Sequence, residues 1–142
     1  MNAVVVLRSG GTLETGLRRV VPDAKIGRAL IQSNVRTGEP ELHYLKLPPT
    51  LHEHCVLVLD PQISSGAAAL MTITVLKDHG VKEENIVFVT YLASEIGVRK
   101  VVKVFPRVKV VVGNRFFILI LNKLLKMKTP QYIEAFFLSY IG

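Results

Sequence analysis

Paired cysteines, tryptophan and long apolar runs are all missing from this sequence of 142 residues. Its single cysteine, Cys55, excludes an intramolecular disulfide, which favours a reducing compartment. No apolar run approaches the roughly 20 residues that a membrane-spanning helix needs. The amino terminus also lacks the basic and apolar regions of a secretory signal. These absences predict a cytoplasmic protein without a transmembrane segment.

The length and composition of the sequence predict one compact domain, and its net charge predicts an anionic ligand. Hydrophobic residues make up 49% of the chain and aromatic residues 7%, which suits the Val- and Leu-rich strands of a parallel sheet. The net charge of +7 fits an anionic ligand such as a phosphate or pyrophosphate, and it would also fit nucleic acid. The basic residues are scattered, with clusters only at Arg18-Arg19 and within 99–103, so we expect most of them to be solvated.

Strand and helix patterns alternate along the chain. Apolar, β-rich runs predict strands, and runs with apolar residues every three or four positions predict helices. Thr12 is suited to cap the helix at 12–20, and Ser94 is suited to cap the helix that follows it. Gly80 is suited to end the helix at 67–79. The alternation predicts an α/β fold, with a mostly parallel sheet and helices on both faces. The predicted strands are 3–7, 26–32, 44–47, 56–59, 86–91 and 108–112, and the predicted helices are 12–20, 67–79 and the segment after Ser94.

The most informative segment covers residues 56–69. A buried apolar strand is predicted first, Asp60 follows where that strand ends, and a helix begins after a loop of small residues. Because Ser64, Ser65 and Gly66 have little bulk, backbone N–H groups can close around an anion at the positive end of this helix. Asp60 lies where open α/β sheets bind ligands, and its carboxylate could accept hydrogen bonds from sugar hydroxyls. An ordinary strand–turn–helix unit is the alternative interpretation.

This segment resembles the 5-phosphoribosyl-1-pyrophosphate (PRPP) loop of type I phosphoribosyltransferases. Its Asp-Pro pair resembles the uracil phosphoribosyltransferases in particular. The stretch Thr37-Gly38-Glu39-Pro40-Glu41-Leu42-His43-Tyr44 resembles the uracil phosphoribosyltransferase-like domain of uridine-cytidine kinase-like proteins. Several motifs recur in order within residues 4–112, namely Leu7-Arg8-Ser9-Gly10, Ile26-Gly27, Leu30-Ile31-Gln32, Tyr44-Leu45-Lys46-Leu47-Pro48, Asp60-Pro61 and Phe105-Pro106.

The resemblance implies a three-layer, Rossmann-like fold and a reaction of pyrimidine salvage. Ribose 5-phosphate would pass from PRPP to uracil, giving UMP and pyrophosphate, with Mg²⁺ accompanying PRPP. Asp60 and Arg8 would be catalytic, since Asp60 would hold the ribose hydroxyls and Arg8 would stabilise the departing pyrophosphate. The resemblance also implies a homo-oligomer, and no nucleic-acid partner is expected. The pyrophosphate would contact Arg8, Ser9, Gly10 and Lys46, and the phosphate loop would consist of Gln62, Ile63, Ser64, Ser65, Gly66, Ala67 and Ala68.

The sequence departs from the family pattern in three places. Ala67 and Ala68 replace the usual glycine and hydroxyl residue, which restricts the loop and removes one phosphate donor. The match begins almost at Met1, so the family's amino-terminal portion is expected to be missing. No Gly-Asp-Arg-type segment occurs near the carboxyl end, so the uracil-binding residues are unknown. We therefore expect a phosphoribosyltransferase-like domain at 1–113, incomplete relative to the family, and a divergent tail at 114–142.

Three interpretations of this tail stay open: a helix covering the core, a basic helix for a membrane surface or partner, and a replaced carboxyl end. Two alternative functions also stay open for the whole chain: a catalytically inactive regulatory or assembly domain, and a nucleic-acid-binding regulator.

Individual residues have alternative interpretations as well. Arg8 and Lys46 could be ordinary surface cations. His52, His54 and Cys55 form a compact possible metal cluster without the partners of a zinc set. The missing Gly-x-x-x-x-Gly-Lys-Ser/Thr motif excludes a P-loop kinase domain from this chain.

Overall fold

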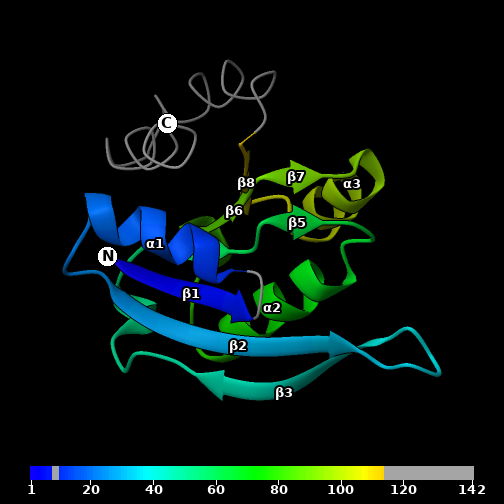
Figure 1. Cartoon of the computed structure of the whole chain (residues 1–142), viewed down its shortest axis with the longest axis horizontal. Helices are drawn as coiled ribbons and strands as arrows, with labels where there is room; N and C mark the ends of the chain where they lie inside the picture. The colour runs from blue at the N-terminus through cyan, green and yellow to red at the C-terminus, as the bar shows by residue number, and fades with distance from the viewer. Residues whose placement is uncertain (8–9, 114–142) are drawn as a thin grey trace.

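Six strands build the main sheet of the computed structural model, which describes residues 1–7 and 10–113 (Figure 1). Their order across the sheet is β3-β2-β1-β4-β6-β8. Every neighbouring pair is parallel except β2 and β3, so β3 is an antiparallel edge strand. The strands are β1 (Asn2–Leu7), β2 (Lys25–Ser33), β3 (Pro40–Lys46), β4 (Val56–Leu59), β6 (Ile86–Thr90) and β8 (Lys109–Val112).

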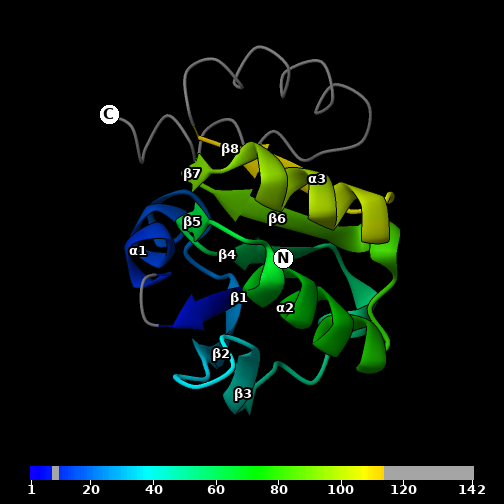
Figure 2. The same ribbon diagram turned by 90° about the vertical axis from the view of Figure 1, so that its right-hand side faces the viewer.

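Three helices cover the two faces of this sheet, α1 (Gly11–Val20) on one face and α2 (Ala67–Asp78) with α3 (Glu95–Val104) on the other (Figure 2). Short 3₁₀ helices occupy Leu51–Glu53 and Glu83–Asn85. A second, two-stranded parallel sheet pairs β5 (Gln62–Ile63) with β7 (Leu92–Ala93). The three-layer α/β fold predicted from the sequence is therefore confirmed.

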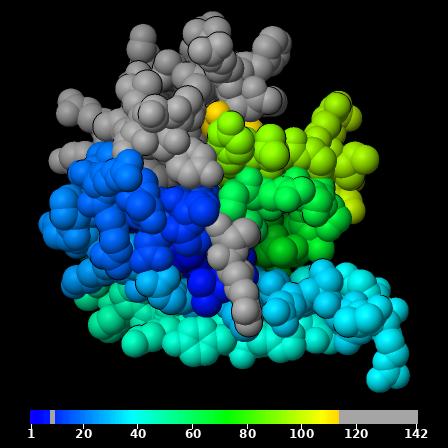
Figure 3. Space-filling model, viewed as in Figure 1, coloured from blue at the N-terminus to red at the C-terminus, as the bar shows by residue number. Residues whose placement is uncertain are grey.

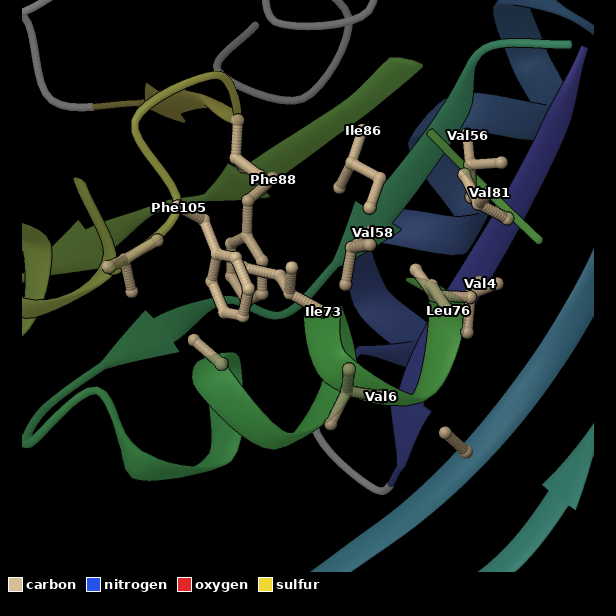
Figure 4. Close-up of a cluster of buried hydrophobic side chains, with 14 of the residues drawn as sticks. Val4, Val6, Val56, Val58, Ile73, Leu76, Val81, Ile86, Phe88 and Phe105 are labelled. Carbon is tan, nitrogen blue, oxygen red and sulfur yellow. The ribbon is translucent and has the colours of Figure 1, made fainter. Parts of the chain in front are cut away.

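The alternation of side chains along each strand explains the two cores. Val4 and Val6 face α2 and pack with Phe88 and Ile73 in the larger cluster, shown in Figure 4. Ala3, Val5 and the other inward residues of the opposite face pack against Leu13 and Leu17 of α1. Because β1 and β4 are buried on both faces, they consist almost entirely of apolar residues.

Most predicted elements are confirmed, and the differences concern their ends. The helix that begins at Ala67 ends at Asp78, and Gly80 follows in the left-handed region at φ 89°. Ser94 caps α3 as predicted, since its Oγ accepts a hydrogen bond of 3.0 Å from the Gly97 N–H. The prediction of Thr12 as a cap is wrong, because α1 begins at Gly11 and its N-cap residue is Gly10. The paired strands β5 and β7 were not predicted.

Two groups of predictions lie outside the described residues. The first concerns the roles of Arg8 and Ser9, and the second concerns the whole tail at 114–142. Within the described part of the chain, no helix combines the length and the hydropathy needed to cross a membrane.

Candidate active site

The carboxyl ends of neighbouring parallel strands bring Gly10, Asp60 and the predicted phosphate loop to one edge of the sheet. β1 lies between β2 and β4, and β4 pairs with β6, so the chain leaves β1, β4 and β6 at the same edge. The backbone N–H of Asp60 donates to the carbonyl of Val89 at 3.1 Å, which ties the end of β4 to β6. Open parallel sheets bind their ligands at this edge.

Asp60 is the buried acid of this edge, with 8% of its surface exposed. Burial raises the pKa of its carboxyl group to about 6, and a hydrogen bond of 3.3 Å from the backbone N–H of Gln62 acts in the opposite direction. The strand therefore delivers a largely desolvated carboxyl group to the ligand-binding edge. Its ionised form is a strong hydrogen-bond acceptor for hydroxyl groups.

The predicted phosphate loop lies between Asp60 and the start of α2. Ser64 and Ser65 are exposed, and Gly66 adopts φ 87° as the N-cap residue of the helix. This left-handed conformation is readily available to glycine and strained for other residues. Ser65 Oγ accepts a hydrogen bond of 3.3 Å from the Ala67 N–H. The first turn of α2 contains no acidic side chain, so no carboxylate competes with an anion at its positive end.

The other predicted anion-binding turn is anchored beside Asp60 through Gly10. The Gly10 N–H donates to the Val6 carbonyl at 2.9 Å. A Cβ atom added at Gly10 would lie 2.6 Å from the carbonyl oxygen of Leu59, the residue before Asp60. The close contact shows that the segment after β1 and the end of β4 meet backbone to backbone. Arg8 and Ser9, which link Leu7 to Gly10 in the sequence, are outside the described residues.

Lys46 lies farther from the acid than the other predicted residues. It is exposed on β3 and pairs with Arg28 of β2 in the antiparallel register. Two strands separate β3 from β4, which corresponds to about 14 Å between their backbones. The described structure therefore does not bring Lys46 into contact with Asp60, and its role in pyrophosphate binding stays a prediction.

Two further sets of contacts involve residues outside the predicted site. Glu14 of α1 accepts hydrogen bonds from both terminal nitrogens of Arg28, at 2.7 and 2.8 Å, and one from Arg18 at 3.2 Å. The bond from Arg28 is the main cause that lowers the pKa of Glu14. Ser94 and Gly97 contact the phosphate loop from α3. The sequence indicates Ser94 only as a helix cap, and no pattern pointed to Glu14, Arg28 or Gly97.

The possible metal cluster at His52, His54 and Cys55 gains no support. Among residues 1–7 and 10–113, no group of three or more His, Cys, Asp or Glu side chains is placed to hold a metal ion. Cys55 is partly buried, and this burial raises the pKa of its thiol.

Solved structures that share this fold include phosphoribosyltransferases. The adenine phosphoribosyltransferase of Giardia lamblia, in complex with 9-deazaadenine, superposes with a TM-score of 0.57 at 17% identity, over 79% of this chain and 68% of that one. At this identity the likeness shows the fold alone. The AQ2163 protein from Aquifex aeolicus superposes with a TM-score of 0.73 at 29% identity, over 80% of this chain and 53% of that one.

The family itself follows from the sequence comparison, in which residues 1–115 match "Uracil phosphoribosyltransferase". The chain belongs to the uracil phosphoribosyltransferase family. It is 46% identical over 111 residues to mouse uridine-cytidine kinase-like 1, covering 78% of this chain and 20% of the relative. It is 44% identical over 111 residues to the uracil phosphoribosyltransferase of Dictyostelium discoideum, covering 78% of this chain and 51% of that relative. The chain thus spans about half of a uracil phosphoribosyltransferase and a fifth of the kinase-like protein.

Proposed function

We propose that this chain is a phosphoribosyltransferase domain that binds PRPP and transfers its ribose 5-phosphate to uracil, with UMP and pyrophosphate as products. The observation that carries the proposal is the placement of Asp60 beside a small-residue loop at the start of α2. This pairing offers a hydrogen-bond acceptor for ribose hydroxyls and a positive helix end for the 5-phosphate. Membership of the family supports the assignment.

The proposed reaction needs positioning and charge stabilisation more than covalent chemistry by the protein. As pyrophosphate leaves, positive charge develops on the ribose ring, and the carboxylate of Asp60 would stabilise it. Ser64 and Ser65 would donate hydroxyl hydrogen bonds to the 5-phosphate, and the N–H groups at the start of α2 would add the helix dipole. Arg8 would neutralise the leaving pyrophosphate, and Lys46 would do so only after movement of β3.

Mg²⁺ is part of the proposal as a companion of PRPP. Magnesium retains several waters and is commonly held by one or two carboxylates together with substrate phosphates. The donor set fits this mode, because Asp60 supplies one carboxylate at the site. When bound, the ion would neutralise pyrophosphate charge. Asp60 and the exposed hydroxyls of the loop would orient the sugar.

Titration calorimetry with PRPP and Mg²⁺ tests the binding step. We expect heat from the wild type and none from Ser65→Asp, since the new carboxylate would lie where the phosphate binds. Ser65→Asn is the matched control, because Asn has the size of Asp without its charge. It removes the Ser65 hydroxyl, so binding should be weakened but not lost. Absence of binding by a folded wild type would contradict the proposal. An assay with labelled uracil then measures whether UMP forms.

A catalytically inactive domain that binds PRPP for regulation or assembly is the second candidate. Ala67 and Ala68 at the start of α2 favour it, since neither supplies a hydroxyl donor to the phosphate. PRPP binding without UMP formation would select this candidate, and turnover with labelled uracil would exclude it.

We include homo-oligomerisation and a cytoplasmic location in the proposal. β3 pairs only with β2 among the described strands, and it exposes Leu42 and Tyr44. The connection between β2 and β3, in cyan, projects from the body of the molecule in Figure 3. An edge strand with exposed apolar side chains is suited to pair with a second copy. Analytical ultracentrifugation of the wild type and of Tyr44→Lys would test this surface.

A further inference from the structure

The first turn of α3 contacts the phosphate loop through hydrogen bonds. The Ser94 N–H donates to the carbonyl of Ile63 at 2.9 Å, and the Ser94 hydroxyl donates to the carbonyl of Ser64. The same hydroxyl oxygen accepts the Gly97 N–H at 3.0 Å. A single side chain thus joins the loop to the helix cap, although Ser64 and Ser94 are 30 positions apart in the sequence.

The backbones of the loop and of α3 also meet directly at two glycines. A Cβ atom added at Gly97 would lie 2.5 Å from the Ser64 carbonyl oxygen and 2.7 Å from Cγ2 of Ile63. A Cβ atom added at Gly66 would lie 2.9 Å from the Gly97 carbonyl oxygen. Gly97 is helical and has no positive φ, so space is what requires glycine there. Any side chain at this position must push the loop away from α3.

We propose that Gly97 and Ser94 are positioning residues, which hold the phosphate loop against α3 with its N–H groups directed at the phosphate. The inference rests on the proposed function, since it assumes that a phosphate binds at this loop. Ile63 is buried in the core and pairs with β7, whereas Ser64 and Ser65 are exposed, so the contacts with α3 act on the part of the loop that follows Ile63. A site whose donors are fixed in advance binds more tightly, because ligand binding need not order them.

The test measures the affinity for PRPP with Mg²⁺, by titration calorimetry, in four variants. Gly97→Ala should weaken binding by roughly tenfold to a hundredfold, as expected if one hydrogen bond to the charged phosphate is lost. Ser94→Ala should weaken it less, and Ser94→Thr should bind as the wild type does because it retains the hydroxyl. Val81→Ala is the control, since it removes buried apolar volume beyond the far end of α2 and should lower only the melting temperature.

Wild-type affinity in folded Gly97→Ala and Ser94→Ala would overturn the inference. If the wild type binds no PRPP, the proposed function fails, and a second measurement judges the positioning role independently. Amide hydrogen exchange of residues 64–68 should be faster in Gly97→Ala and Ser94→Ala than in Val81→Ala, because only the first two lose the contact with α3. Equal exchange in all variants would show that α3 does not hold the loop.

Discussion

Gln62 donates its backbone N–H to Oδ1 of Asp60 across 3.3 Å, in the turn that leaves the acid only 8% exposed at the end of β4. This one hydrogen bond stabilises the ionised carboxylate, but burial has the larger effect and raises the pKa of Asp60 to about 6. A charge kept in poorly solvated surroundings destabilises the folded chain. The candidate site therefore holds an acid whose ionisation, which the proposed binding of ribose hydroxyls needs, costs stability.

We predict that Asp60→Asn stabilises the fold above pH 6. The folded pKa of Asp60 is about 6, against 3.8 in the unfolded chain, so the folded state binds the proton more tightly. The cost of ionising Asp60 is absent below the unfolded pKa, grows between the two values and is complete above about 6. The difference of roughly two pH units corresponds to at most about 3 kcal/mol. Urea unfolding at pH 8 should show the gain.

The same measurement at pH 3.5 is the control, since Asp60 is then protonated in the folded state and the two proteins should have similar free energies of unfolding. Asn retains an oxygen that can accept the Gln62 N–H, so the substitution removes the charge and keeps the turn. A variant that is less stable than the wild type at pH 8 would contradict the prediction.

The affinity for PRPP should fall as the pH decreases below about 6, because the ribose hydroxyls then meet a protonated Asp60. We expect a decline that approaches roughly tenfold per pH unit once the acid is mostly protonated. The phosphates of the ligand titrate near the same pH. Calorimetry on Asp60→Asn over the same range therefore serves as the reference, and only the difference between the two profiles reports on Asp60. Parallel profiles would show that its ionisation is not needed.

Two adjacent glycines should respond to alanine in opposite directions. At Gly10 the new Cβ would lie 2.6 Å from the carbonyl oxygens of both Leu59 and Val6, whereas at Gly11 nothing lies within 4 Å. We expect Gly10→Ala to lower the free energy of unfolding by about 1–3 kcal/mol through overpacking. Gly11→Ala should raise it by up to about 1 kcal/mol, because Gly11 begins α1 and alanine favours helix. Urea unfolding of both variants tests the pair.

The local structure around the candidate site follows from the sequence where its residues are consecutive. The buried strand, Asp60 and the small-residue loop are consecutive, so the pattern of residues 56–69 was enough to predict the end of β4 and the start of α2. The sequence predicts a mostly parallel sheet but not the order of its strands. That order determines that Gly10 meets Leu59 and that Lys46 lies two strands from β4.

The long-range contacts around the site could not be predicted, because they depend on which distant segments meet. Ser94 reaches Ser64 across 30 positions, and Arg28 reaches Glu14 across 14. Neither contact has a local signature, since a serine before a helix is explained by capping alone. The N-cap of α1 was assigned to Thr12 for a similar reason. Gly10 takes that place, and its close approach to the end of β4 leaves no room for a side chain.

The ion pair between α1 and β2 yields the last prediction. Glu14 accepts two hydrogen bonds from Arg28 and one from Arg18, and its pKa is lowered chiefly by the bond from Arg28. Since the folded pKa is depressed, this stabilisation is present above 4.5 and is lost as the pH falls through the lower folded value. We expect Glu14→Gln to cost about 1 kcal/mol at pH 7, the upper end for a partly exposed pair.

The difference from the wild type should shrink in urea unfolding as the pH falls below 4.5 and through the lowered pKa of Glu14. Glu95→Gln is the matched control, because it breaks the ion pair with Arg99 on α3, whose two side chains are 76% and 78% exposed. Solvent screens that pair, so its loss should leave unfolding unchanged. A cost that persists at acid pH, or an equal cost for Glu95→Gln, would show that the geometry of this ion pair does not stabilise the fold.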